Sequence, residues 1–136
     1  MRRHLQGIDH AVVLVRDLDK ARDAYARMGF MLTPRGYHTL GSQNHCLMFG
    51  RDYLELLAVP KSHPATQQYS DFLAKGEGLG AVALATDDAG ALQTGLAADG
   101  IVAEAPLDFA RPVGNLGDAR FRIVQLPPDA SPGCRA

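Results

Sequence analysis

The sequence has few of the features that mark specialised classes of protein. It contains two cysteines and no tryptophan in 136 residues, which excludes a dense disulfide framework and favours a reduced interior. Fourteen basic and fifteen acidic side chains give a formal net charge of −1, which offers little attraction to nucleic acid or to an anionic membrane surface. No apolar run is long enough to span a membrane, and the first residues lack the apolar core of a signal peptide. We therefore expect a cytoplasmic protein without a membrane or nucleic-acid partner.

The sequence does contain an internal repeat, and its length fits one domain over residues 1–136. A strand-like stretch, an acidic residue, a helix-like stretch and a glycine occur twice, at an offset of 71 residues. Asp17 and Asp88 can cap the two helices, because a carboxylate accepts the free amide hydrogens of the first turn. Gly29 and Gly100 can end them in the left-handed conformation. Matching caps, ends and spacing favour a duplicated strand–helix unit over coincidence.

The two copies of the repeat are predicted to differ in their number of strands. The first copy is expected to hold strands at 8–15, 30–34, 44–49 and 53–59 and a helix at 18–28, and the second to hold strands at 79–85, 101–107 and 119–126 and a helix at 89–99. The predicted fold class is therefore α+β, with paired βαβββ modules at about 5–60 and 78–127, a connector at 61–77 with a short helix at 65–75, and a loose tail at 128–136. The second module lacks its last strand, and an open sheet edge predicts a homodimer or a strand supplied from elsewhere. A chain that is a fragment of a longer protein would show the same pattern.

One imidazole interrupts the apolar strand predicted at 8–15. Both faces of this strand are apolar, so both must be covered. His10 shares a face with Val12 and Leu14, since side chains alternate along a strand. A polar group there needs a partner. His10 is therefore either a core histidine bonded to a backbone carbonyl or a functional group that faces a pocket.

A carboxylate occupies the middle of the strand predicted at 53–59. Tyr53, Glu55 and Leu57 share one face, which we expect to look into a concavity, and the alternate residues form an apolar face suited to helices. A buried carboxylate is costly unless it is paired or bound to a metal. If the strands are neighbours, Glu55 and His10 converge as a donor set for zinc, manganese, iron, nickel or cobalt. The alternative is a structural pairing of Glu55 with an arginine or tyrosine.

Polar residues precede and enter the strand predicted at 44–49. Asn44, Cys46 and Met48 share one face, and we expect Asn44 and Met48, with Tyr53, to contact a small ligand. Turn chemistry explains Asn44 equally well. Cys46 is interpreted as a small apolar filler.

The remaining polar residues lie in or beside predicted loops. His38, His45 and His63 are expected in solvent. Arg111, Asn115 and Arg120 flank a second loop and can meet an anionic group, with a purely surface role as the alternative for each.

These features resemble the vicinal oxygen chelate superfamily, which includes glyoxalase I, extradiol dioxygenases, and fosfomycin- and bleomycin-resistance proteins. The resemblance rests on the paired modules, the opening IDHAVVLVRDLDKA, the run GSQNHCLMF at 41–49 and the strand YLEL from Tyr53. The last two are similar to the glyoxalase-like domain subgroup. The resemblance covers about residues 7–127. It implies an open, cup-shaped mixed sheet with helices on the outside and a small molecule in the cup.

The resemblance also implies which residues carry the chemistry. Metal-dependent members take ligands from the first and last strands of both modules, and these positions match His10 and Glu55 in the first module. The repeat equivalent of His10 is Ala81, and the last strand of the second module is missing, so one chain supplies two ligands where a catalytic metal normally has three. Either another subunit completes such a site or this chain does not carry out the metal chemistry.

Two functions follow from the resemblance. In the first, a glyoxalase-like enzyme acts on a small oxygenated metabolite, with His10 and Glu55 as metal ligands or as an acid–base pair in lyase, isomerase or dioxygenase chemistry. In the second, the chain is a non-catalytic module that binds or sequesters a small molecule, as in the bleomycin-resistance branch.

Overall fold

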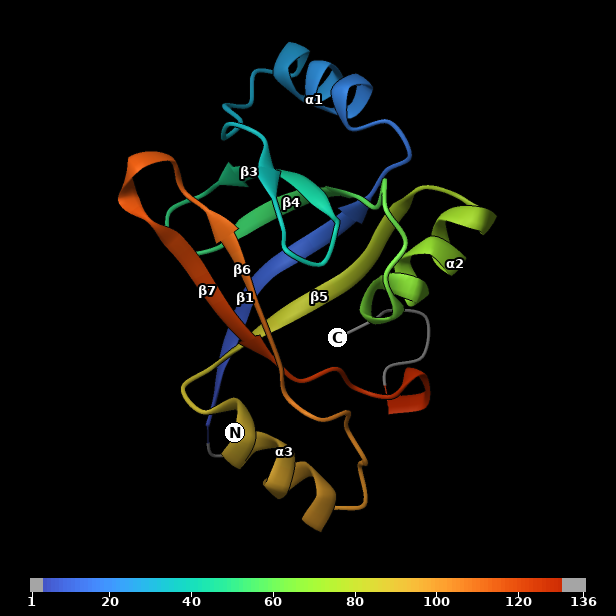
Figure 1. Cartoon of the computed structure of the whole chain (residues 1–136), viewed down its shortest axis with the longest axis vertical. Helices are drawn as coiled ribbons and strands as arrows, with labels where there is room; N and C mark the ends of the chain where they lie inside the picture. The colour runs from blue at the N-terminus through green and yellow to red at the C-terminus, as the bar shows by residue number, and fades with distance from the viewer. Residues whose placement is uncertain (1–3, 131–136) are drawn as a thin grey trace.

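The structure, a computed structural model, describes residues 4–130 (Figure 1). The strands are β1 (Leu5–Leu14), β2 (Gly36–Tyr37), β3 (Gln43–Met48), β4 (Tyr53–Ala58), β5 (Gly78–Thr86), β6 (Leu107–Pro112) and β7 (Asp118–Ile123). The helices are α1 (Leu18–Arg27), α2 (Gln67–Lys75) and α3 (Ala89–Ala98), with short 3-10 turns at Pro64–Thr66, Gly114–Leu116 and Pro128–Ala130. Cys134 and most of the predicted tail lie outside the described residues.

The strands form a five-stranded mixed sheet and a two-stranded ribbon. The sheet has the order β2-β3-β4-β1-β5, with β1 parallel to β4 and antiparallel to β5. The ribbon of β6 and β7 crosses over this sheet (Figure 1). The Thr39 backbone amide donates to the Ala110 carbonyl at 3.0 Å, which joins the ribbon to the segment after β2. An open mixed sheet with helices outside it confirms the predicted fold class.

Both predicted helix caps are present. Asp17 and Asp88 each accept a hydrogen bond of 2.9 Å from the backbone amide three residues further on. Gly29 and Gly100 follow the helices with φ of 94° and 81°, a region that favours glycine. Among residues 4–130, no helix has the length and apolar character needed to cross a membrane.

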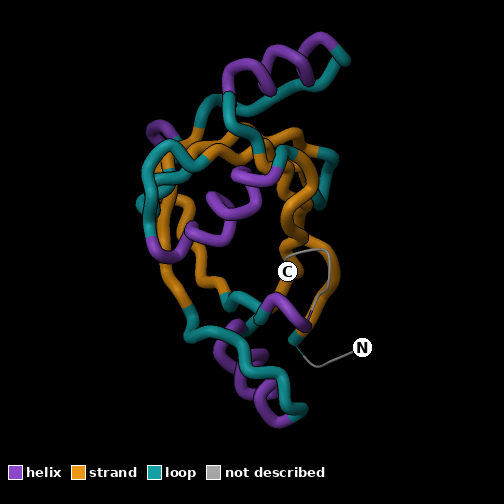
Figure 2. The backbone as a smooth tube through the Cα atoms, turned by 90° about the vertical axis from the view of Figure 1, so that its right-hand side faces the viewer, coloured by secondary structure: helices purple, strands orange, loops and turns teal. Residues whose placement is uncertain are grey.

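The repeat is visible in the register between β1 and β5. His10 lies opposite Ala83, and Val12 lies opposite Ala81. Ala81 is the repeat equivalent of His10, and Ala83 is the repeat equivalent of Val12. His10 therefore pairs with the equivalent of Val12, and Val12 pairs with the equivalent of His10. The two copies are thus related by a local two-fold rotation, which places α1 and α3 at opposite ends of the molecule (Figures 1 and 2).

The sheet is covered on both faces, as the apolar pattern of β1 predicts. On the outer face, one buried cluster packs beside α1 and contains Val15, Leu18, Leu47, Leu56 and Ala58. On the inner face, a second cluster packs against α2 and contains Val12, Leu14, Leu57 and Ala81, in contact with Tyr69, Phe72 and Leu73. Figure 2 shows the strands curving around the interior between these layers.

Two predicted strands are wrong. Residues 30–34 contain no strand, although the Thr33 amide donates to the Cys46 carbonyl at 2.9 Å. Residues 101–106 are also irregular, and β6 begins only at Leu107. Pro34 and Pro106 end these two segments and lack the amide hydrogen that a strand ladder needs, and each segment keeps a backbone bond to a neighbouring segment, from Thr33 to Cys46 and from Glu104 to Gln125.

Candidate functional site

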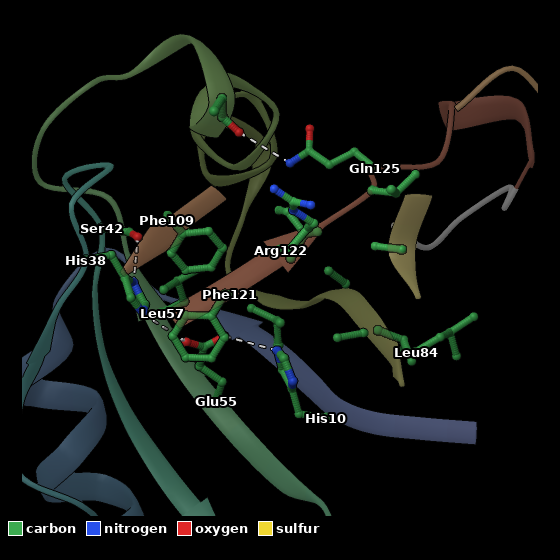
Figure 3. A pocket seen from close by; sticks show the side chains of 18 of the residues that line it. His10, His38, Ser42, Glu55, Leu57, Leu84, Phe109, Phe121, Arg122 and Gln125 are labelled. Atoms are coloured by element: carbon green, nitrogen blue, oxygen red, sulfur yellow. Dashed lines mark hydrogen bonds and ion pairs between the residues drawn. The ribbon is translucent and has the colours of Figure 1, made fainter. Parts of the chain in front are cut away.

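A cavity of about 390 Å³ lies between the inner face of the five-stranded sheet and the β6–β7 ribbon (Figure 3). Residues from α2, α3 and the segment after β7 complete its lining. Most of the wall is apolar. The polar groups discussed below are His10, His38, Asn44, Glu55 and Arg111. A largely apolar cavity with a few convergent polar groups is typical of a small-molecule site.

The structure brings His10 and Glu55 together at this cavity. The parallel pairing of β1 and β4 sets Val12 opposite Glu55, and His10 is two residues away on the same face. The His10 Nε2 atom lies 3.5 Å from Glu55 Oε2. On its other side, His10 Nδ1 is 2.7 Å from a carboxylate oxygen of Asp9. The ring also stacks on Tyr53 with centroids 4.4 Å apart, so its orientation is fixed from three directions.

Asn44 holds the other oxygen of the Glu55 carboxylate. Its Nδ2 atom donates to Glu55 Oε1 at 2.6 Å, from the neighbouring strand β3. Both side chains are buried, at 2% and 7% exposure. Asn44 lines the cavity as expected, and it also satisfies the buried carboxylate.

Burial and mutual attraction together set the charges of this pair. Burial favours the neutral ring of His10, but hydrogen bonds and charge from Glu55 and Asp9 outweigh it and raise the pKa of His10 above 6.5. Burial likewise opposes ionisation of Glu55, but His10 and the Asn44 amide hold the pKa of this carboxyl below 4.5. Each shift favours the charged form of its group, because the imidazole and the carboxylate attract each other when both are ionised.

The stability supplied by this pair is expected to depend on pH in both directions. Because the pKa of Glu55 is lowered from 4.5, its contribution is present above that value and is lost as the pH falls through the folded pKa. Because the pKa of His10 is raised from 6.5, its contribution is complete below 6.5 and is lost as the pH rises through the folded pKa. Urea unfolding from pH 6 to 9 (roughly the window of the His10 shift) should show a decline that is shallower in His10→Gln. Equal slopes in the two proteins would contradict this origin of the decline.

His38 and His45 correct the expectation that these histidines lie in solvent. The His38 side chain is only 7% exposed, lines the cavity and places Nε2 4.0 Å from Glu55 Oε1. Burial, together with the charges of Arg111 and His10, lowers the pKa of His38, so its ring is neutral. His45 is 4% exposed, and its Nδ1 atom lies 2.7 Å from the Thr33 carbonyl oxygen.

His63 lies at a turn, as expected, and is partly buried there. Its Nδ1 atom accepts a hydrogen bond of 3.1 Å from the Ala65 amide at the start of the short 3-10 turn before α2.

The loop cations and aromatics contribute more than the sequence indicated. Arg111 lines the cavity, whereas Asn115 and Arg120 are exposed and are not part of its lining. Phe109 and Phe121 stack with centroids 4.9 Å apart, and both rings lie perpendicular to the His38 ring, at 5.5 and 6.5 Å between centroids. No local signal connects these residues, because they come from segments about 70 positions apart that only the folded ribbon brings together.

The three remaining candidate residues differ in position. Tyr53 lines the cavity, and burial with the charge of Glu55 raises the pKa of its phenol, which stays neutral. Cys46 is 4% exposed, and burial raises the pKa of its thiol to about 11, which agrees with an inert filler. Met48, at the end of β3, is 57% exposed and does not line the cavity.

The residues of the site do not complete a metal centre. His10 and Glu55 are adjacent, as the predicted metal pair requires, but within residues 4–130 no group of three or more His, Cys, Asp or Glu side chains is placed to hold an ion. Ala81 lines the cavity at the position where the repeat would supply a further ligand. A catalytic metal normally has three protein ligands, so we derive no step that uses one.

The chain was compared with known families and structures. The family model described as "Glyoxalase-like domain" matches residues 8–135. No curated protein matches the sequence. Among solved structures, a hypothetical protein from Staphylococcus aureus is 18% identical with a TM-score of 0.78; the match covers 95% of this chain and 56% of that protein, so this chain spans little more than half of it.

Methylmalonyl-CoA epimerases are also similar in structure. The enzyme from Mycobacterium tuberculosis is 23% identical with a TM-score of 0.76, over 99% of this chain and 87% of that one. A variant of the Streptomyces coelicolor enzyme in complex with 2-nitronate-propionyl-CoA is 27% identical with a TM-score of 0.75, over 96% and 91% of the two chains.

Proposed function

This chain belongs to the glyoxalase-like domain family, and from that basis we propose that it is an enzyme that moves a proton on a small oxygenated metabolite bound in the cavity. Glu55 is the proposed base and His10 its charged partner. The observation that carries the proposal is the His10–Glu55 pair, with Nε2 and Oε2 3.5 Å apart, beside a ligand-sized, mostly apolar cavity. Perturbed ionisable pairs in such cavities are typical of acid–base sites.

The proposed step is removal of a proton from the carbon next to a carbonyl group. The C–H bond breaks, the proton passes to the Glu55 carboxylate, and the electron pair moves onto the carbonyl oxygen to form an enolate. Asp9 occupies Nδ1 of His10, and Nε2 faces Glu55 at 3.5 Å. When Glu55 takes up the proton it loses its charge, and a protonated Nε2 can then donate a hydrogen bond to the enolate oxygen. Return of the proton completes an isomerisation. The apolar wall strengthens both electrostatic interactions by limiting water.

The structural neighbours support this class of reaction. The Streptomyces coelicolor protein, at 27% identity, is an epimerase, and the structure of its variant contains 2-nitronate-propionyl-CoA. Another methylmalonyl-CoA epimerase structure, also at 27% identity, contains methylmalonyl-CoA. An epimerase must remove and return a proton at a carbon centre, and a nitronate is planar and anionic, as an enolate is. An isomerase or lyase that works through an enolate therefore suits this chain better than a dioxygenase.

A second candidate is a module that binds a small molecule without chemistry, as proposed for the bleomycin-resistance branch. It is favoured by Ala81, which offers no ligand or acid–base group at the position equivalent to His10. In this case Glu55 and His10 serve mainly to satisfy each other.

Proton exchange in deuterated water separates the two candidates. We expect NMR to show protein-dependent loss of the proton next to the carbonyl in at least one member of a panel of oxo acids and acyl thioesters. Addition of zinc, manganese or a chelator to the same assay shows whether the predicted divalent metal contributes. Tight binding without any exchange would overturn the enzyme and support the binding module.

We also propose that the chain forms a homodimer. In the described part of the chain, β5 is the outer strand of the five-stranded sheet, and Leu79 on it is 56% exposed. Open edges with exposed apolar residues favour association. Light scattering at moderate concentration should give about twice the chain mass, and a monomeric mass would contradict the proposal.

A further inference from the structure

The cavity has a polar side and an apolar side. His38 and Ser42 lie on the opposite side of the cavity from Leu84 (Figure 3). Most of the remaining wall is apolar and comes from residues of β5, α3 and the ribbon, among them Ala83, Leu84, Leu92, Leu96, Phe109 and Phe121. Arg122 and Gln125 are polar exceptions on the side away from His38, and Phe109 and Phe121 lie beside the His38 ring. A ligand that fills this space must therefore combine a compact polar group with a substantial apolar body.

Arg111 is a cation of this cavity, and among residues 4–130 its side chain has no hydrogen-bond or ion-pair partner. Its Nε atom is buried without a hydrogen bond, and no carboxylate of residues 4–130 forms an ion pair with its guanidinium. By contrast, Arg122, which also lines the cavity, is paired with Asp108 at 2.7 Å. A buried donor without a partner is costly, and a ligand acceptor would remove that cost.

Close packing places Arg111 beside the proposed catalytic groups. A methyl group at Gly36 would clash with both Asn44 Oδ1 and Arg111 Cδ, so these two side chains meet over that glycine. Within the described part of the chain, the Asn44 Oδ1 atom also has no hydrogen-bond partner, while the Nδ2 atom of the same amide donates to Glu55. A group bound at Arg111 would therefore lie next to the Glu55 carboxylate.

The surrounding charges restrict which anion fits. Guanidinium binds carboxylate and phosphate through paired hydrogen bonds. The ionised Glu55 repels a phosphate dianion more strongly than a carboxylate monoanion. The neutral His38 adds no positive charge to offset this repulsion. A planar group with a single negative charge is the better match.

We propose that the ligand is a carboxylic acid with an apolar body, bound through its carboxylate to Arg111 and through its body to the wall formed by β5, α3 and the ribbon. This inference rests on the proposed function, because it concerns the same cavity and names the class of substrate bound there. The stacked pair of Phe109 and Phe121 supplies a flat apolar surface for that body.

Calorimetric titration of matched acids and amides tests the inference. The probes are 3-phenylpropanoate, 3-phenylpropanamide, acetate and inorganic phosphate. We expect 3-phenylpropanoate to bind the native protein at least about tenfold more tightly than each of the other three, since a hydrogen bond to a charged group contributes roughly that much.

Variants of two arginines test whether Arg111 is responsible for the preference for the acid. Arg111→Gln should weaken the binding of 3-phenylpropanoate about 10- to 100-fold and change the affinity for the amide less than about threefold. Arg120→Gln, on the exposed side of β7, is the matched control and should change neither affinity. Thermal melts show whether each variant is folded. Equal affinities of acid and amide for the native protein, equal losses in Arg111→Gln, preference for phosphate, or no binding by the acid would each overturn the inference.

The exchange assay distinguishes failure of the carboxylic-acid inference from failure of the proposed function. Arg111-dependent acid binding without proton exchange would support the inference and overturn the enzyme. Proton exchange on acyl thioesters without a free carboxylate, together with no preference for acids in the titration, would support the enzyme and overturn the inference.

Discussion

Glu55→Gln is expected to reduce the rate of proton exchange by about 10²- to 10⁴-fold, the usual contribution of a general acid–base group. Glutamine has nearly the same shape and can still accept the hydrogen bond that the Asn44 amide now gives to Glu55. It has no carboxylate to receive the proton. Ligand affinity, measured by the same calorimetry, should change by less than about tenfold, because the wall of the cavity is unchanged.

Glu104→Gln is the matched control for this experiment. Glu104 is exposed, and its side chain is not part of the cavity lining. The control should retain the native exchange rate. Full exchange activity in Glu55→Gln would remove Glu55 from the role of base, whereas equal loss in both variants would point to a general effect of the substitution.

Leu56→Ala is expected to cause a large loss of stability. Leu56 is fully buried in β4, in the cluster that seals the outer face of the sheet against α1. Truncation removes apolar contact and leaves a cavity that the surrounding strands can fill only partly. The expected cost is about 2–5 kcal/mol in the free energy of unfolding, with a fall in Tm of roughly 10 °C.

Equilibrium urea unfolding measures this loss, with Leu116→Ala as the matched control. Leu116 is 89% exposed, so the same chemical change should cost less than about 0.5 kcal/mol. The midpoint of Leu56→Ala should fall without a change in the m value. Similar midpoints for the two variants would show that the outer cluster does not hold the sheet as described.

The sequence alone predicted the framework of the fold, because that information is local. Alternation along β4 places Glu55 on the inner face and Leu56 in the outer cluster, as observed. Asp17 and Asp88 cap their helices because capping depends on residues only three positions apart. At 30–34 and 101–106 the apolar pattern predicted strands that the structure lacks, although Pro34 and Pro106 are local signals against a regular strand.

The sequence also indicated one half of the candidate site. His10 and Glu55 are polar residues in otherwise apolar strands, so a buried partner was required for each. Their meeting at 3.5 Å follows once β1 and β4 lie side by side with both polar residues on the inner face. Whether the pair serves catalysis or only satisfies burial is a separate question, which the exchange assay addresses.

The other half of the site was decided by tertiary structure. His38 belongs to a loop whose polarity predicted exposure, and it is buried because Phe109 and Phe121 of the ribbon cover it. Arg111 comes from the same ribbon and meets Asn44 only over the bare backbone of Gly36. Burial of a loop side chain depends on what folds over it, and those contacts join segments about 70 residues apart. Local pattern therefore determined the strands, caps and polar pair, and the long-range closure of the ribbon determined the cavity and the unpaired cation within it.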